Sequence, residues 1–322
     1  MKAVQINEHG GPETLKYQDV ADLEPGPGEA LLELQAVGIN YADVYSRSGN
    51  NPAAPLPRTI GMEGAGLVRS VGQGVTQVKE RDVVAYCMVQ GSYAQQALVP
   101  AAKLIKMPQG LAPRDGAAAM LQGMTARYLC KSTYAVQPGD RTLVHAGAGG
   151  VGLLLTQMIK KLGGYVFSTV STEAKAQLSK EAGADQVILY GQQDFAEEIK
   201  RETGGEGVKV AYDSVGQTTF DKSISCLSRR GHMVLYGQAG GPVTSMDPRV
   251  LSNGSLFLTR PGLGDYTATR EELEQRAGDV LGWVSSGELK LRIEHVFPLQ
   301  EAAEAHRQLE GRATTGKVLL IP

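Results

Sequence analysis

The pattern of apolar and polar positions changes character about a third of the way along the chain. Residues 1 to about 110 form short runs of mixed or alternating apolarity, separated by turn signals such as the Pro-Gly-Pro-Gly segment at residues 25–28. This spacing predicts short strands in a small barrel-like β-domain. Helix-like spacing interrupts the strands near residues 41–47 and 113–120. The predicted strands cover residues 2–7, 16–19, 30–37, 65–70, 82–88 and 92–99.

From residue 140 onward, strand-like and helix-like runs alternate. A helix predicted over residues 122–136 ends before a Pro-Gly-Asp stop, and the βαβα order that follows is typical of a parallel, doubly wound sheet. Predicted strands 141–146, 165–170, 186–190, 208–213, 232–236 and 255–259 alternate with helices 151–162, 173–182, 195–202 and 219–229. Helices over 269–286 and 299–309 and strands over 291–297 and 317–321 close the chain. We expect this C-terminal segment to fold back onto the first domain.

A glycine turn lies between the predicted strand 141–146 and the predicted helix 151–162. Gly147, Gly149 and Gly152 match the dinucleotide fingerprint G-x-G-x-x-G. In that fingerprint the first glycine allows a tight turn, the second admits a pyrophosphate, and the third lets the helix pack on the strand. With 40 glycines in 322 residues some matches arise by chance, and a plain tight turn is the alternative. The strand before the turn and the helix after it favour a nucleotide site.

The residues after the second strand of this unit favour NADP over NAD. An Asp or Glu at the strand tip selects NAD by accepting the ribose 2′-OH, whereas here Ser171 and Thr172 follow the strand, with Lys175 one helical turn on. A 2′-phosphate is repelled by a carboxylate and attracted by a lysine. Glu173 is the counter-argument, although an acid in the first turn of a helix also stabilises the helix dipole. Lys175 is alternatively an ordinary solvated residue.

Composition excludes several classes of function. The formal charge of −2 and a pI near 6.2 provide no electrostatic footprint for nucleic acid. No apolar run approaches the ~18 residues of a membrane span, and the first residues lack the apolar core of a signal peptide. The three cysteines lie far apart, which suits small core residues in a reducing cytoplasm.

Several motifs in order along the whole chain resemble those of one family. They are HGGPETL (9–15), GINYADVYSRSG (38–49), HAGAGGVG (145–152), YDSVG (212–216), TRP (259–261) and ATTGKVLLIP (313–322). Together they are similar to the zinc-free, zeta-crystallin-like quinone oxidoreductases of the medium-chain dehydrogenase/reductase superfamily. The resemblance implies an α/β fold with a GroES-like β-barrel-type domain (residues 1–123 and 265–322) and a doubly wound, parallel-sheet Rossmann domain that binds NADPH (124–264).

The departures from zinc-dependent relatives concern the metal. In the zinc alcohol dehydrogenases of this superfamily a cysteine ligand stands where this chain has Asn40, and a histidine ligand where it has Met62. Glu63 remains, but one carboxylate does not replace the three protein ligands of a catalytic zinc. The four cysteines of a structural zinc lobe are also missing from residues 90–121. We therefore expect no metal, with Glu63 in a structural or supporting role.

The resemblance also implies a set of NADPH-binding residues. Asn40 and Thr125 match positions beside the nicotinamide, and Tyr236 and Gly237 end a strand at the expected ligand edge of the sheet. The other implied cofactor residues are Gly147, Gly149, Gly150, Val151, Gly152, Ser171, Lys175, Tyr190 and Arg312.

The implied reaction is hydride transfer from NADPH to a small quinone, without metal or flavin, by a cytoplasmic enzyme. Asn40 and Tyr45 are assigned to orienting a carbonyl and Arg260 to stabilising negative charge; alternatively Tyr45 packs in a helix and Arg260 binds the cofactor. His145 and His232, in predicted core strands, are interpreted as packed imidazoles rather than acids. The rival activity is reduction of an activated C=C bond, of the 2-alkenal or enoyl type. The family also implies a homodimer, with residues 256–258 as a candidate pairing segment.

Overall fold

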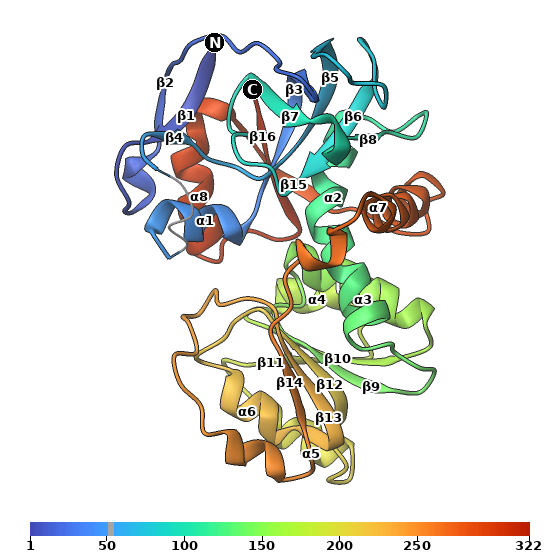
Figure 1. Cartoon of the computed structure of the whole chain (residues 1–322). Coiled ribbons are helices and arrows are strands. Elements are labelled where there is room, and N and C mark those ends of the chain that lie inside the picture. The colour runs from blue at the N-terminus through green and yellow to red at the C-terminus, as the bar shows by residue number, and fades with distance from the viewer. Residues whose placement is uncertain (51–54) are drawn as a thin grey trace. The chain divides into compact units, whose positions relative to one another are not determined.

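The computed structural model describes residues 1–50 and 55–322 and divides the chain into two compact units (Figure 1). The first unit contains Met1–Met124 and Thr267–Pro322, and the second contains Thr125–Tyr266. Among the described residues, no helix combines the length and the apolar character that crossing a membrane requires.

Two sheets form the first unit. One has the strand order β2-β1-β4; the other has the order β15-β16-β3-β5-β6-β8, with β7 also paired to β3. The 11-residue strand β3 is the centre of the larger sheet, because β16, β5 and β7 all pair with it. The strands are β1 Lys2–Ile6, β2 Lys16–Asp19, β3 Glu29–Ile39, β4 Arg58–Thr59, β5 Glu63–Val71, β6 Val83–Cys87, β7 Gln96–Pro100, β8 Ile105–Lys106, β15 Ile293–Pro298 and β16 Lys317–Ile321.

The last strand returns to the first unit, as the sequence predicts. In β16 the residue Val318 lies opposite Ile39 of β3 in an antiparallel pair. Both side chains are buried in a core that also receives Leu299 and Ala305 from the C-terminal segment. The helices of this unit are α1 Tyr41–Ser48, α7 Arg270–Ser285 and α8 Ala302–Glu310, and α2 Pro113–Tyr128 runs across the boundary between the units.

The second unit is a six-stranded parallel sheet with the order β11-β10-β9-β12-β13-β14. Numbered within the unit this order is 3-2-1-4-5-6, the doubly wound order of dinucleotide-binding sheets. Helices α3 and α4 lie on one face and α5 and α6 on the other (Figure 1). The elements are β9 Arg141–Val144, α3 Gly150–Lys161, β10 Tyr165–Val170, α4 Glu173–Glu181, β11 Gln186–Leu189, α5 Phe195–Glu202, β12 Val208–Asp213, α6 Phe220–Ser225, β13 Leu227–Leu235 and β14 Phe257–Thr259.

Two of the helix predictions differ from the structure. The helix predicted over 219–229 is wrong beyond Ser225, because Leu227 already pairs with Val208 of β12 and begins β13. A left-handed residue, Arg230 (φ 60°), and a register shift lie within that strand. The separate helices predicted over 113–120 and 122–136 are one continuous α2, followed by a π-turn over Leu129–Thr133.

Candidate functional site

The glycine turn between β9 and α3 is built by close packing. A Cβ atom on Gly152 would lie 2.4 Å from the Ala146 carbonyl oxygen and 2.9 Å from the Gly147 Cα, so only glycine fits there without a backbone shift. A Cβ on Gly147 would lie 1.7 Å from Ser168 Oγ. The left-handed residue of the turn is Ala146 (φ 52°) rather than one of the three glycines. The first glycine therefore lets the turn pack on β10, and the third lets α3 pack on the turn that follows β9.

The second glycine differs, and it marks the face that is open to a ligand. A Cβ on Gly149 would have one close neighbour, the Ala146 carbonyl oxygen at 3.2 Å. Gly149 is the N-cap of α3, whose first N–H groups, on Gly150, Val151 and Gly152, have no carbonyl four residues back within the helix. A helix N-terminus without a capping side chain presents N–H donors and a positive dipole end to an anion. This arrangement fits the diphosphate of a dinucleotide.

Two further candidate residues lie at the carboxyl ends of the neighbouring strands β10 and β11. The Thr172 side chain caps α4 by accepting from the Lys175 N–H (3.3 Å), which places Lys175 in the first helical turn after Ser171. The Tyr190 N–H donates to the Val170 carbonyl (3.2 Å), so Tyr190 lies beside the end of β10. The Tyr190 side chain is exposed. The glycine turn, Ser171 and Tyr190 thus follow three adjacent strands at one edge of the sheet.

The other half of that edge brings together Tyr236, Gly237 and Arg260. Tyr236 follows β13, and its N–H donates to the Asp213 carbonyl at the end of β12 (2.9 Å). Arg260 follows β14 and donates through Nη2 to Gln238 Oε1 (2.8 Å). Gln238 was not predicted as a site residue, because it belongs to no motif and its one signal is its place next to Gly237.

A buried polar chain supports the same edge from inside the sheet. His145 is 1% exposed and its ring nitrogens hydrogen-bond to Thr169 Oγ1 and Ser223 Oγ, both at 2.8 Å. Ser223 Oγ donates in turn to Asp213 Oδ2 (3.3 Å). Burial lowers the pKa of His145, which opposes a role as an acid. The interpretation of His145 as a packed imidazole is confirmed; His232 likewise packs between the rings of Tyr134 and Phe257.

The first unit holds Asn40 in a buried triangle of polar side chains. Asn40 is 5% exposed and lies at the N-cap of α1. Its Nδ2 donates to Glu63 Oε2 (2.9 Å), and its Oδ1 accepts from Lys317 Nζ (3.0 Å). Lys317 Nζ also pairs with Glu63 Oε2, while Glu63 Oε1 accepts the Leu121 N–H (2.6 Å). The expectation of a structural or supporting role for Glu63 is consistent with these contacts.

Lys317 was not predicted as a site residue, although it lies in the motif ATTGKVLLIP (313–322). Lys317 begins β16, in which the next three residues are fully buried. A lysine at the end of an apolar strand is ordinarily a solvent-facing cation. The related sequence signal is Glu63, expected as a structural or supporting carboxylate. The fold buries it, and a buried carboxylate requires a cation or hydrogen-bond donors from elsewhere in the chain.

The remaining first-unit candidates surround α1. Tyr45 is half-buried, with its ring centroid 6.0 Å from that of Tyr41. Arg312 follows α8 in a left-handed conformation (φ 58°). Burial raises the pKa of Tyr41, and the nearby charge of Arg312 lowers it, so Arg312 lies within electrostatic range of α1. Thr125 is buried and belongs to the second unit, where it lies in α2.

A metal ion does not fit the donors around Asn40, Met62 and Glu63. In the described part of the chain, no three His, Cys, Asp or Glu side chains converge as metal ligands would. Glu63 is engaged by three donors, one of them the ammonium of Lys317, which would repel a cation. Asn40 and Met62 supply no thiolate or imidazole.

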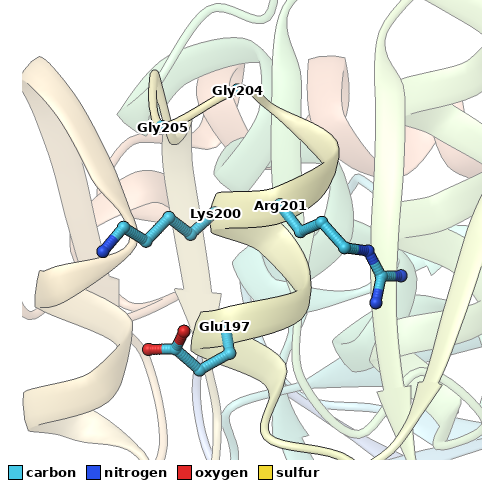
Figure 2. Close-up of a pocket in the computed structure, with 5 residues that line it drawn as sticks. All are labelled: Glu197, Lys200, Arg201, Gly204 and Gly205. Atoms are coloured by element: carbon cyan, nitrogen blue, oxygen red, sulfur yellow. The ribbon is translucent and has the colours of Figure 1, made fainter.

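A shallow hollow of about 410 Å³ lies at the end of α5 and is lined by Glu197, Lys200, Arg201, Gly204 and Gly205 (Figure 2). The side chains of Lys200 and Arg201 point in opposite directions there. Arg201 is paired with Glu198 and Glu202 on its own helix. Because α5 runs from the end of β11 to the start of β12, this hollow lies at the amino edge of the sheet, away from the glycine turn.

Comparison with known proteins gives full-length matches. Residues 26–109 match the family model described as alcohol dehydrogenase GroES-like domain, and residues 182–320 match the one described as zinc-binding dehydrogenase. The chain is 42% identical to a quinone oxidoreductase of Pseudomonas aeruginosa, covering 100% of this chain and 99% of that one. It is 41% identical to a 2-haloacrylate reductase of a Burkholderia species, covering 99% and 98%. The solved structure of an Escherichia coli quinone oxidoreductase complexed with NADPH superposes with a TM-score of 0.98, 41% identity and full coverage of both chains.

Proposed function

Because the chain belongs to the quinone oxidoreductase family of the medium-chain dehydrogenase/reductase superfamily, we propose that it reduces small quinones with NADPH. The observation that carries the proposal is the packed glycine turn that leads into the open N-terminus of α3, in a chain similar from end to end to an enzyme solved with NADPH. We assign most of the cofactor contacts to the Rossmann part, residues 124–264, and most of the substrate pocket to the GroES-like part, residues 1–123 and 265–322.

The chain offers a donor for each charged part of NADPH. The N–H groups at the start of α3 would hold the diphosphate, and Lys175 would pair with the 2′-phosphate. Bound NADPH supplies a hydride to an electrophilic acceptor. The residues proposed to hold it are Asn40, Thr125, Gly147, Gly149, Gly150, Val151, Gly152, Ser171, Lys175, Tyr190, Tyr236, Gly237 and Arg312.

The substrate pocket needs donors for a carbonyl oxygen and no Lewis acid. A quinone is planar and already electrophilic, so positioning and charge stabilisation suffice. Asn40 and Tyr45 would orient the carbonyl, and Arg260 would stabilise negative charge that develops on oxygen. The bond from Arg260 to Gln238 fixes its guanidinium beside Gly237, which also suits contact with the cofactor. Zinc has no role in this mechanism, because the donors around Glu63 do not fit it.

Lys175→Ala tests the cofactor assignment. We expect the KM for NADPH to rise about 10- to 100-fold, since a charge-assisted hydrogen bond to the 2′-phosphate contributes about 1.5–3 kcal/mol. The KM for NADH should change little. Steady-state oxidation of each nucleotide with a benzoquinone measures both, and Lys180→Ala, on the same helix, is the control. Equal effects on NADPH and NADH would contradict the assignment.

Reduction of an activated C=C bond is the second candidate, favoured by the 41% identity to a 2-haloacrylate reductase. The same hydride donor serves both reactions, so the acceptor decides between them. NADPH oxidation with a panel of quinones and a panel of enones and haloacrylates separates the two: turnover with the second panel alone would replace the quinone assignment.

We further propose a homodimer formed through β14. This strand is the edge of the six-stranded sheet, and Phe257 on it is 53% exposed. An exposed apolar edge strand favours pairing with a second copy. We expect Phe257→Lys to shift sedimentation equilibrium from dimer toward monomer, with Val250→Lys, another exposed apolar site, as the control. A Phe257→Lys protein as dimeric as the parent would contradict this interface.

We also propose that the protein acts in the cytoplasm. All three cysteines, Cys87, Cys130 and Cys226, are free thiols and buried, which is typical of chains kept in a reducing compartment. Fractionation of the producing cells tests this placement.

A further inference from the structure

Lys317 and Glu63 form an ion pair inside the first unit. The Lys317 side chain is 3% exposed and that of Glu63 is 0% exposed. They come from strands far apart in the sequence, β16 and the start of β5. Gly38 makes room for them, because a Cβ there would lie 2.3 Å from Glu63 Oε2 and 2.7 Å from Lys317 Nζ. The local backbone is thus shaped around this pair.

The pair fixes the carboxamide of Asn40 in one orientation. A lysine ammonium only donates hydrogen bonds and an ionised carboxylate only accepts them. Asn40 must therefore direct Oδ1 to Lys317 and Nδ2 to Glu63. The structure shows this orientation: Oδ1 lies 3.0 Å from Lys317 Nζ, and Nδ2 lies 2.9 Å from Glu63 Oε2. A flipped amide would set its NH₂ group against an ammonium and its oxygen against a carboxylate. The orientation is determined by charge.

The third contact of this amide is its weakest. Nδ2 also donates to the Gly38 carbonyl, at 3.4 Å, which is long for a hydrogen bond. A substrate oxygen would compete for this second amide hydrogen. The cation on Oδ1 polarises the amide and makes its N–H groups better donors.

We propose that Lys317 is a positioning residue for quinone reduction, which with Glu63 holds and polarises the Asn40 carboxamide so that one amide hydrogen is directed to the substrate carbonyl. This inference rests on the proposed function, in which Asn40 orients that carbonyl. Lys317 acts through Asn40 and need not touch the substrate.

The test removes both charges together. Lys317→Met alone leaves the buried Glu63 without its partner and threatens folding, whereas Glu63→Gln/Lys317→Met removes the pair and keeps the packing volume. We expect kcat with a quinone to fall about 10- to 100-fold, as loss of an oriented charge-polarised donor predicts. The dissociation constant of NADPH, from fluorescence titration, should rise by a smaller factor than kcat falls, since Asn40 is one of many residues proposed to hold the cofactor and the double substitution removes none of them. Asp19→Asn/Lys2→Met, which removes an exposed ion pair of the same unit, is the matched control.

The positioning role predicts strong non-additivity. In an Asn40→Ala background the double substitution should cost less than about threefold further, because the group that it positions is already gone. The proposal would be overturned if the double substitution lowered kcat equally in the parent and in the Asn40→Ala protein. It would also be overturned if kcat did not fall in the parent.

A second readout does not depend on activity. The chain has five asparagines, so selective ¹⁵N-asparagine labelling gives few side-chain amide signals, and Asn40→Ala assigns the one in question. We expect the Asn40 carboxamide protons to exchange with water slowly in the parent and at least about tenfold faster in Glu63→Gln/Lys317→Met. If these protons exchanged equally fast in both proteins, the proposal that the ion pair holds the Asn40 carboxamide would be overturned. If the parent oxidises no NADPH with quinones but shows this difference, the proposed function fails while the locked amide stands.

Discussion

Gly152→Ala is expected to destabilise the protein and to abolish tight NADPH binding. The new Cβ would lie 2.4 Å from the Ala146 carbonyl oxygen and 2.9 Å from the Gly147 Cα, and both atoms are backbone. Overpacking of this kind costs about 1–3 kcal/mol, while alanine gains about 1 kcal/mol over glycine in helix propensity. Since neither backbone atom can move without reshaping the turn, we expect the upper part of that range and a net loss of about 2 kcal/mol in the free energy of unfolding.

The effect on binding follows from the same displacement. Any shift of α3 away from β9 moves the N–H groups that would hold the diphosphate. Urea unfolding and fluorescence titration with NADPH measure the two effects. Gly149→Ala is the matched control, because its Cβ has one neighbour at 3.2 Å: stability should change by less than about 1 kcal/mol, yet NADPH affinity should fall as the methyl group enters the ligand face. A Gly152→Ala protein with parental stability and affinity would contradict the packing argument.

The fold was predictable because its signals are local and repeated. Strands β10, β12 and β16 and helix α5 have the predicted limits. The strands are largely apolar runs, whereas α5 is a charged helix whose buried apolar residues, Phe195 and Ile199, are spaced one helical turn apart. The two-residue strands β4 and β8 were missed, because two residues carry no periodicity. The helix predicted beyond Ser225 failed for another reason: Leu227 fits helical spacing, and the parallel pairing with Val208 overrides it.

The site residues could be predicted only where a sequence motif is associated with a known local geometry. The glycine turn and the residues that follow β10 and β11 are adjacent because parallel strands share a carboxyl edge. The contact of Lys317 with Asn40 spans 277 positions of sequence and depends on the register of β16 against β3. Nothing near Asn40 in the sequence specifies that partner. The same holds for His306 and Tyr93, which meet 213 positions apart.

The contact between His306 and Tyr93 belongs to a buried chain of hydrogen bonds that begins and ends on α1, at Arg47 and Asp43. Because a guanidinium can only donate, His306 Nδ1 accepts from Arg47 (3.0 Å), and His306 Nε2 therefore donates to the Tyr93 hydroxyl (2.9 Å). The Tyr93 hydroxyl in turn donates to Asp43 Oδ2 (3.2 Å). Burial lowers the pKa of His306 to about 3, and Arg47 adds to the shift. Burial raises the pKa of Asp43 to about 7, with Glu63 adding to the rise. The Asn40 N–H, Lys317 and Tyr93 oppose it.

These two shifts act on stability with opposite signs. Asp43 has a pKa of 3.8 when unfolded, so its contribution to stability is full below that value and is lost as the pH rises through about 7. His306 has a pKa of 6.5 when unfolded, so its contribution is full above that value and is lost as the pH falls through about 3. Between roughly pH 4 and 6.5 the two slopes cancel. This cluster therefore leaves the stability of the parent nearly independent of pH in that window.

Asp43→Asn should remove the pH dependence of stability that comes from Asp43 and leave the one that comes from His306. We expect its free energy of unfolding to rise with pH between about 4 and 6.5, and to exceed that of the parent at pH 8 by about 1–3 kcal/mol. The full shift corresponds to about 4 kcal/mol, reduced by the cost of an amide NH₂ group where Asp43 Oδ1 has no partner among the described residues. Urea unfolding from pH 4 to 8 measures both profiles. His306→Gln should show the opposite slope. An Asp43→Asn profile parallel to the parent and below it at pH 8 would mean that the folded protein holds Asp43 ionised, stabilised by Lys317 more strongly than burial opposes it.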